Sequence, residues 1–298
     1  MCILAAARAG ASFAEIEIRF PLQGGADDVV RLVDASLPAS TALVVLDFVT
    51  SNTALALPLA ELVPLIRSRC PHAVVVIDAA HALGATALLD VPSLGADFVA
   101  GNCHKHWCAP RGSAFLWAAP GAARAWLRPV VVSHGTGRGF FSDFAWDGNR
   151  DYSPVLSLGA TLTWWASIGQ ERGVEYMRQA LRDGALTLLS RWRTSLLVPL
   201  ALCTNMCVVR LPEAGVTRPA PAGEQELLSR HPPEGNGHFN SDDAKAFQDE
   251  LFAAAIEVPV KCIQGRLYVR CSAHVYTINR DFECLATFVD TTSTLRCN

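Results

Sequence analysis

Hydrophobic and polar residues follow two different spacings in the first two thirds of the chain. Short apolar runs, which are typical of buried strands, occur at 13–20, 41–48, 73–78, 97–101 and 113–118. Between them, the segments 27–37 and 57–70 repeat apolar residues at helical spacing. Buried strands that alternate with helices predict an α/β fold with a mostly parallel sheet covered on both faces. We expect function at the carboxyl ends of such strands.

The pattern changes after a long helical stretch at 152–192. A short apolar run at 205–211 is followed by a loop rich in Pro, Gly and Glu at 212–240. The helical and strand patterns beyond this loop predict a small α+β domain. We therefore predict a large domain at 1–194, which includes the connecting helix, and a small domain at 195–298.

Composition narrows the classes of function. The chain has 298 residues, of which 51% are hydrophobic, so it can bury a large core. A net charge of −3 without basic runs argues against nucleic acid or a membrane surface as partner and favours a small polar substrate. No apolar run is long enough to span a bilayer, and the first residues fit a signal peptide poorly.

The cysteines point to a reducing compartment. The chain holds 10 of them, without a Cys-x-x-Cys pair or a Cys/His quartet of the kind that binds zinc. We interpret them mainly as buried thiols, and we predict a cytoplasmic protein without a metal site.

Candidate chemistry gathers where two neighbouring predicted strands end. Asp78 ends the run at 73–78 and His81 follows it, while Asn102, His104 and Lys105 follow the next run. An amine that forms a Schiff base and a carboxylate that keeps a pyridine nitrogen protonated are what pyridoxal 5′-phosphate requires. Once displaced by a substrate amine, such a lysine is free to take the substrate's Cα proton.

Six blocks of the sequence resemble a known family, and they occur in that family's order. They are "DFVTSNTALALP", "VIDAAHALGA", "LGADFVAGNCHKHWCAPRGSAFLW", "VVSHG", "WDGNRDYSP" and "RLYVRCSAHVYT". On these blocks the chain resembles the class V aminotransferases among the fold-type I pyridoxal phosphate enzymes, in the branch that contains isopenicillin N epimerase. The resemblance implies the large domain of that fold, with its N-terminal part missing from this chain, and a homodimer.

The resemblance also implies roles for individual residues. Lys105 matches the Schiff-base lysine, Asp78 the partner of the pyridine nitrogen, and His81 the group near the cofactor's phenolic oxygen. Arg270 matches the arginine that grips the substrate α-carboxylate, a role suited to its planar guanidinium.

Other matched positions would surround the cofactor. Asn102 and His104 would help to hold its phosphate, and Ser51 or Asn52 would contact its phenolic oxygen. Asn149 stands where the family has a threonine that reaches the phosphate of the neighbouring subunit, and His106 stands where the branch has tryptophan.

Three functions remain open on the sequence. The first is epimerase-like action at Cα of an amino acid or small peptide. The second is a pyridoxal phosphate-dependent C–S lyase, or cysteine desulfhydrase, on the same scaffold. The third is a truncated, non-catalytic fragment. The first two share removal of the Cα proton, and no residue spacing decides between them.

Overall fold

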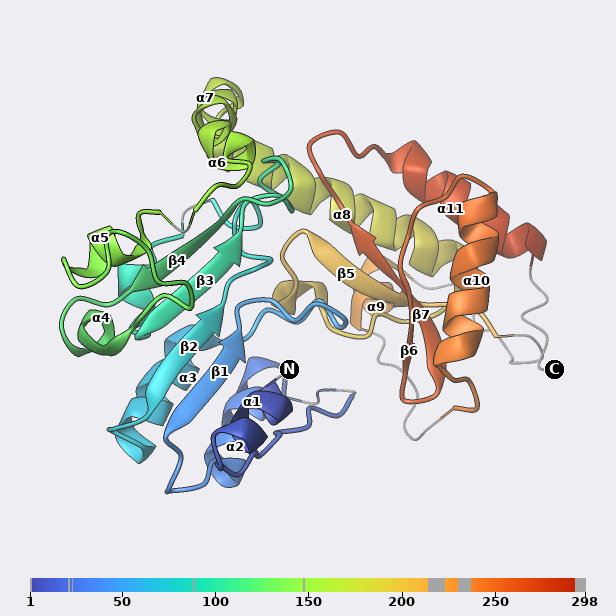
Figure 1. Cartoon of the computed structure of the whole chain (residues 1–298). Coiled ribbons are helices and arrows are strands. Elements are labelled where there is room, and N and C mark those ends of the chain that lie inside the picture. Colours follow the sequence, from blue (N-terminus) through green and yellow to red (C-terminus); the bar gives the residue numbers. More distant parts are fainter. Residues whose placement is uncertain are drawn as a thin grey trace.

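A four-stranded sheet and a three-stranded sheet, joined by a long helix, make up the protein (Figure 1). The computed structural model describes residues 2–292 except 21, 23, 88, 147, 214–222 and 230–236. The larger sheet has the order β1-β2-β3-β4, with bounds Leu43–Asp47, Val74–Asp78, Phe98–Asn102 and Ala114–Ala118. β1, β2 and β3 are parallel, and β4 is antiparallel to β3. The predicted α/β class with a mostly parallel sheet is confirmed.

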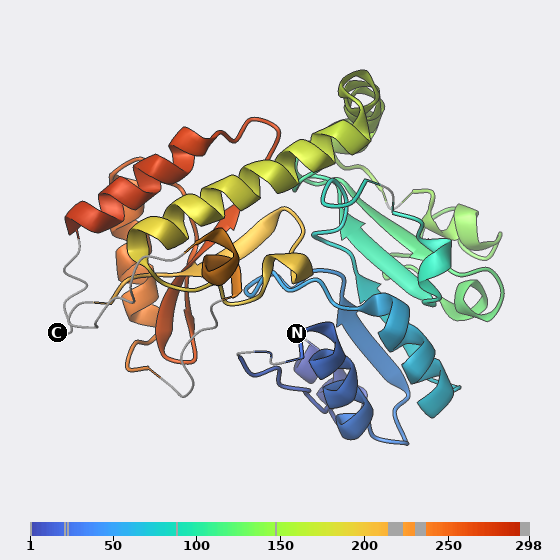
Figure 2. The same cartoon turned by 180° about the vertical axis from the view of Figure 1, so that it is seen from behind.

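One face of this sheet is packed against helices. Val75, Ile77 and Val99 point to this face and are fully buried, in one hydrophobic cluster with residues of α2 (Ala26–Ser36) and α3 (Leu59–Arg69). Figures 1 and 2 show both helices on that side. Burial on this face follows from the two-residue period of the strands, which places every second apolar residue towards the helices.

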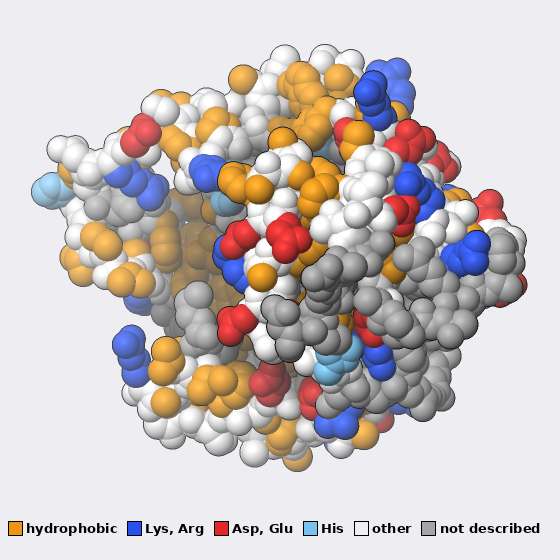
Figure 3. Space-filling view, turned by 90° about the vertical axis from the view of Figure 1, so that its right-hand side faces the viewer, with side chains coloured by type: hydrophobic (Ala, Val, Ile, Leu, Met, Phe, Trp, Pro, Cys, Tyr) orange, Lys and Arg blue, Asp and Glu red, His pale blue; other side chains and the backbone are white. Residues whose placement is uncertain are grey.

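The opposite face is only partly covered within the described residues, in contrast to the expectation of cover on both faces. Phe98 packs there with residues of α4 (Ala122–Trp126) and α5 (Phe140–Phe144). Leu43, Val45 and Leu116 lie on the same face and remain 46–56% exposed. Figure 3, which views the molecule from another side, shows further hydrophobic side chains inside a hollow.

The long helical stretch is broken into three helices. They are α6 (Ser153–Leu156), α7 (Leu158–Ile168) and α8 (Gln170–Trp192). Gly169 separates α7 from α8 with a φ of 78°, a left-handed conformation that glycine adopts without steric cost. α8 runs from the larger sheet to the smaller one (Figure 2).

The smaller sheet is antiparallel and has its own hydrophobic cluster. Its strand order is β5-β7-β6, with bounds Met206–Arg210, Arg266–Ser272 and Val260–Ile263. Its cluster includes residues of α8, α9 (Glu224–Ser229), α10 (Ser241–Ala253) and α11 (Asn279–Thr292). Short helices elsewhere are α1 (Cys2–Arg8), η1 (Pro92–Leu94) and η2 (Leu200–Leu202).

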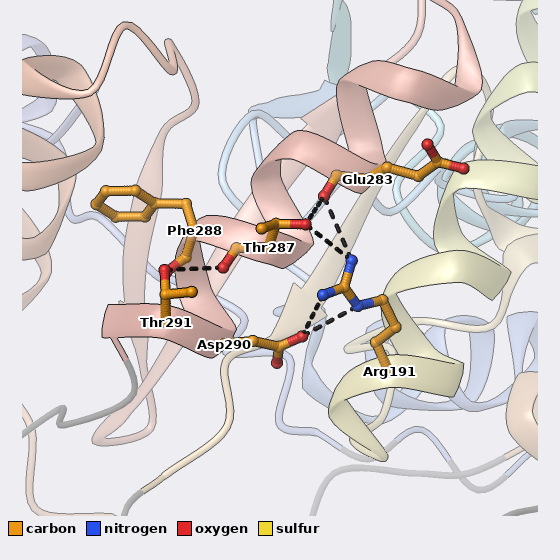
Figure 4. Close-up of polar contacts among 6 residues, drawn as sticks. All are labelled: Arg191, Glu283, Thr287, Phe288, Asp290 and Thr291. Atoms are coloured by element: carbon orange, nitrogen blue, oxygen red, sulfur yellow. Dashed lines mark hydrogen bonds and ion pairs between the residues drawn. The ribbon is translucent and has the colours of Figure 1, made fainter.

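Polar contacts at one end of α8 attach it to α11 (Figure 4). Arg191 donates to Asp290 over 3.0 Å and to the Thr287 hydroxyl over 3.0 Å. The contact joins the helix that spans both sheets to the last helix of the small one.

The strand predicted at 13–20 is wrong. This segment belongs to no sheet of the described chain, although Ile16 and Ile18 pack against the large core and Phe20 is buried. The alternation of apolar and polar residues in 13–20 correctly indicated which side chains face the core. It could not report a hydrogen-bonded neighbour, which a strand also needs.

The predicted domain boundary and the predicted loop at 212–240 are tested only in part by the structure. The two sheets lie on either side of the predicted boundary at residue 195, but the division into domains 1–194 and 195–298 stays a prediction. Much of the predicted loop at 212–240 lies outside the described residues.

Among the residues that the structure describes, no helix is long and apolar enough to cross a membrane.

Candidate active site

Lys105 lies in a tight turn directly after β3. Its carbonyl accepts a hydrogen bond from the Cys108 amide over 3.1 Å, and the Ala109 amide donates to the Cys103 carbonyl over 3.0 Å. Lys105 Nζ is 3.1 Å from Nε2 of His81, which follows β2. The predicted meeting of these two side chains at adjacent strand ends is therefore what the fold produces.

Burial controls the protonation of this pair. It lowers the pKa of the Lys105 amine; Asp78 and Asp47 oppose that effect, and Arg270 adds to it. Burial also lowers the pKa of His81 to about 4, with further lowering by Lys105 and Arg270. His81 is therefore neutral at neutral pH, and when Lys105 is protonated the ring accepts a hydrogen bond at Nε2 and keeps its proton on Nδ1.

Two carboxylates, rather than one, lie at the strand ends. Asp78 ends β2, is exposed, and accepts a hydrogen bond from the Ala80 amide over 2.9 Å. Asp47 ends β1 and pairs with Asp78 in register, so both project from the same face of the sheet. Burial raises the pKa of Asp47, as does the neighbouring Asp78. Asp47 was missed, although the runs "LVVLD" and "VVVID" end alike.

Arg270 reaches the site from the smaller sheet. It lies on β7, and its Nη1 donates to the Ser51 carbonyl over 2.6 Å and to the Ser51 hydroxyl over 3.3 Å. Burial lowers its pKa. The guanidinium thus joins the smaller sheet to the loop after β1, in which Asn52 follows Ser51 and is exposed.

The remaining predicted residues are Asn102, His104 and Asn149. Asn102 ends β3 on the face that carries Asp78, and His104 is half-buried beside Lys105. Asn149 is exposed in the loop between α5 and α6, and among the described residues no hydrogen bond ties it to Lys105. Among the residues that the structure describes, Asn149 thus has no direct polar link to Lys105.

The site has hydrogen-bonding capacity that a polar ligand can use. Buried polar atoms normally have partners, yet Nδ1 of His81, Nδ1 of His104 and Nε of Arg270 have none among the residues that the structure describes. An amine of lowered pKa, a carboxylate and an arginine are also the groups that a pyridoxal cofactor and an amino-acid substrate require. The fold and the site thus indicate an α/β enzyme that uses a lysine amine, Lys105, at the end of a strand.

Comparison with known proteins identifies the family. The aminotransferase class-V family model matches residues 3–195, so the chain belongs to this family. The cofactor that membership implies is pyridoxal 5′-phosphate.

Two curated relatives are named for different reactions. The chain is 31% identical to putative L-cysteine desulfhydrase 1 of Oryza sativa subsp. japonica, over 94% of this chain and 58% of that protein. It is 33% identical to isopenicillin N epimerase of Amycolatopsis lactamdurans, over 59% of this chain and 47% of that protein. The chain thus spans about half the length of these relatives.

Solved structures share the fold. The cystine C–S lyase C-DES, in complex with cysteine persulfide, has a TM-score of 0.74 at 19% identity, over 97% of this chain and 70% of that chain. The cysteine desulfurase of Thermococcus onnurineus NA1 has a TM-score of 0.69 at 18% identity, over 96% and 67%.

Proposed function

We propose that this class V protein acts at Cα of a small amino acid, and that its reaction is β-elimination of sulfide from L-cysteine or a related thiol amino acid. The observation that carries the proposal is the Lys105 amine, half-buried, of lowered pKa and 3.1 Å from a neutral histidine. A lysine in such a setting is a nucleophile and a base at the same position.

Each residue has a proposed task. Bound pyridoxal 5′-phosphate would supply an electron sink for the charge left at Cα when its proton is removed. Lys105 would tether the cofactor and then take the Cα proton on Nζ. Asp78 would stabilise positive charge on the ring nitrogen, and His81 would hydrogen-bond near the phenolic oxygen.

Other residues would orient cofactor and substrate. We assign phosphate contacts to Asn102 and His104, and a contact with the phenolic oxygen to Ser51 or Asn52. Arg270 would release Ser51 and bind the substrate α-carboxylate, since its planar guanidinium offers two parallel donors to a carboxylate.

Coverage favours elimination over epimerisation. The likeness to the rice protein named as a putative L-cysteine desulfhydrase extends over 94% of this chain, and that to isopenicillin N epimerase over 59%. In the favoured reaction, L-cysteine and water give pyruvate, ammonia and hydrogen sulfide. The Cα proton goes first to Lys105, and the Cβ–S bond then breaks with its electron pair leaving on sulfur.

Epimerisation is the second candidate, supported by the identity of 33% to isopenicillin N epimerase. It needs an acid on the opposite face of the substrate to return the proton, whereas elimination needs a leaving group on Cβ. A third possibility, that the chain is a non-catalytic fragment, is decided by the same experiment.

Assembly and location complete the proposal. We propose a homodimer in which Asn149 of each chain serves the phosphate of its neighbour, because Asn149 is exposed and matches the family position that reaches the neighbouring subunit. We also propose a cytoplasmic location, in keeping with the free cysteines among the described residues.

The experiment begins with the absorbance spectrum of the chain after addition of pyridoxal 5′-phosphate. Borohydride reduction and peptide mass spectrometry should then place the cofactor on Lys105; Lys245 and Lys261, the other two lysines of the chain, are internal controls. Trapping on either control would contradict the assignment.

Product analysis then separates the reactions. Incubation with L-cysteine should release sulfide and pyruvate in equal amounts. A D-isomer without sulfide would favour epimerisation. Absence of cofactor binding and of any product would identify a non-catalytic chain.

A further inference from the structure

The residue after Lys105 is held from the smaller sheet by both its ring and its backbone. His106 is 8% exposed, and its Nδ1 lies 2.9 Å from the side-chain amide nitrogen of Asn205. Its carbonyl lies 2.9 Å from Nε2 of His274. Asn205 directly precedes β5 and His274 follows β7, so both partners belong to the ends of paired strands.

The hydrogen-bond partners determine the orientation of the Asn205 amide. Its nitrogen also lies 3.2 Å from the Ala273 carbonyl, which can only accept a hydrogen bond. The atom that faces Ala273 must therefore be the NH₂ group, and the same group faces His106. Because that NH₂ group donates, Nδ1 of His106 carries no proton, and the proton of the neutral ring is on Nε2.

The tautomer of His274 follows from the same logic. The Val275 amide donates to Nδ1 of His274 over 2.9 Å, so Nδ1 carries no proton. Nε2 then carries it and donates to the His106 carbonyl. Cys108 Sγ is 3.0 Å from the same Nε2, but this nitrogen is already protonated and is not a base for the thiol. The pair Cys108–His274 is therefore no activated nucleophile, and burial raises the pKa of Cys108.

On its other side, the turn that contains His106 packs closely against the segment after β2, which carries His81. A Cβ atom on Gly84 would lie 2.5 Å from the His106 carbonyl oxygen, and Gly84 has a φ of +76°. His106 therefore lies between the segment after β2 and the strand ends of the smaller sheet. The Trp107 carbonyl adds a further attachment, because Trp165 of α7 donates to it over 3.0 Å.

We propose that Asn205 and His274 are positioning residues for Lys105: they brace the ring and backbone of His106 and so hold the neighbouring amine inside the site. The brace consists of His106, Asn205 and His274. It rests on the proposed function only in that Lys105 is taken to be the reactive amine. At neutral pH it bears no charge, because burial lowers the pKa of His106 to about 3 and also lowers that of His274.

An uncharged brace matters because of what already surrounds Lys105. His81 and Asp78 face it from β2, Asp47 from β1 and Arg270 from β7. Loosening the brace would let the amine move towards water, which removes the main cause of its lowered pKa. The pH at which Lys105 loses its proton is therefore a measure of its position.

The first test uses the wild-type chain. Nitrogen NMR on the chain with labelled histidine, assigned by single histidine variants, reports which ring nitrogens carry protons. We expect His106 and His274 to be protonated on Nε2 alone, and His106 to stay neutral well below the ordinary histidine range. A proton on Nδ1 of His106, or ordinary titration of His106, would overturn the proposal.

The second test measures Lys105 directly. The chain is freed of any cofactor with hydroxylamine and dialysed, and its lysines are acylated competitively over a range of pH and quantified by mass spectrometry. Acylation of Lys105 is normalised to Lys245 and Lys261 in the same sample. Asn205→Leu and His274→Leu should shift the Lys105 profile upward towards the ordinary lysine pKa.

Two controls separate positioning from general stability. His274→Gln keeps an N–H donor for the His106 carbonyl, so it should retain the wild-type profile. Asn240→Ala removes the N-cap of α10, which lowers stability far from the site, and should not move the profile either. An unchanged profile in folded leucine variants, or an equal shift in Asn240→Ala, would refute the brace.

Circular dichroism first establishes which variants fold, and the wild-type NMR result decides alone if the leucine variants do not. Both tests use cofactor-free protein. Their outcome is therefore independent of whether sulfide, a D-isomer or no product is found.

Discussion

Burial gives the side chains around Lys105 their chemical character. Lys105 and His81 share a 3.1 Å contact, and burial lowers the pKa of both. A lowered amine pKa increases the fraction of uncharged lysine at neutral pH, which is the form that attacks a carbonyl. A neutral His81 leaves the site with less positive charge than its composition suggests.

Asp78→Asn should reduce turnover much more than cofactor affinity. The variant keeps the size of the side chain but removes the charge that would hold a proton on the ring nitrogen. Because one pKa unit corresponds to about 1.4 kcal/mol, we expect kcat to fall at least about 10-fold. Asp90→Asn, an exposed aspartate in another loop, is the matched control. Unchanged turnover in Asp78→Asn would remove this residue from the mechanism.

Arg270→Lys should raise KM for substrates with an α-carboxylate and leave the cofactor spectrum unchanged. Lysine cannot reproduce the two parallel donors of the guanidinium. A hydrogen bond to a charged group contributes about 1.5–3 kcal/mol, so the rise should be about 10-fold or more. Arg266→Lys, on the same strand but paired with Glu213, is the control. Loss of cofactor absorbance with a constant KM would make Arg270 structural.

The sequence could predict site residues that follow a strand but not those that meet across the fold. Lys105 and His81 follow neighbouring apolar runs, so their contact could be expected. His106 and Asn205 are 99 residues apart, and His106 and His274 are 168 apart. No local spacing reports such contacts, which depend on how the two sheets pack.

At the scale of elements, apolar runs predicted strands well but not their partners. The runs at 41–48, 73–78 and 97–101 became parallel strands, while the run at 113–118 became an antiparallel one. The short turn that contains Lys105 reverses the chain between β3 and β4, and the apolar pattern of the run does not reveal this reversal. The segment 13–20 shows the same limit, because its apolar side chains face the core without a neighbouring strand.

Gly184→Ala should destabilise the packing of α8 on α11. Its added Cβ would lie 2.3 Å from the ring of Phe282, and overpacking of this kind costs about 1–3 kcal/mol. Gly159→Ala in α7 meets nothing within 4 Å and should be neutral or stabilising by up to about 1 kcal/mol. Urea unfolding of both variants measures the difference. Equal stabilities would mean that Phe282 moves aside without cost.

For the whole molecule, stability should decrease as the pH falls below 6.5. The pKa of His81 is lowered from 6.5 to about 4 and that of His106 to about 3, chiefly by burial. The unfolded chain therefore binds protons that the folded chain does not, so the stabilisation is complete above pH 6.5 and is lost towards pH 4 and below. Since one pKa unit is worth about 1.4 kcal/mol, we expect a loss of at least about 1 kcal/mol.

Urea midpoints at neutral pH and near the lowered pKa of His81 measure this loss. His81→Gln is the comparison, because it lacks one of the two groups while the carboxylates titrate as before. Its stability should depend less steeply on pH than that of the wild type. Parallel pH profiles would contradict the buried, neutral state of His81.

Self-association is the last prediction at this scale. Val130, Phe141 and Leu156 are 76–102% exposed and come from the segment around α5 and α6, on either side of the exposed Asn149. Exposed apolar side chains can mark contact surfaces. We therefore expect a dimer in sedimentation experiments at micromolar concentration, with Asn149 delivered to the neighbouring chain.

Leu156→Asp should shift this dimer towards monomer, because a buried and unpaired carboxylate destabilises an apolar interface. Binding of pyridoxal 5′-phosphate should weaken in parallel, because separation of the chains removes Asn149 from the neighbouring phosphate. Phe252→Asp is the matched control, since Phe252 is 67% exposed on α10 beside the smaller sheet. Phe252→Asp should change neither the mass of the assembly in sedimentation nor the affinity for pyridoxal 5′-phosphate. A monomeric wild type that binds the cofactor tightly would show that each chain completes its own site, and a dimer that survives Leu156→Asp would place the interface elsewhere.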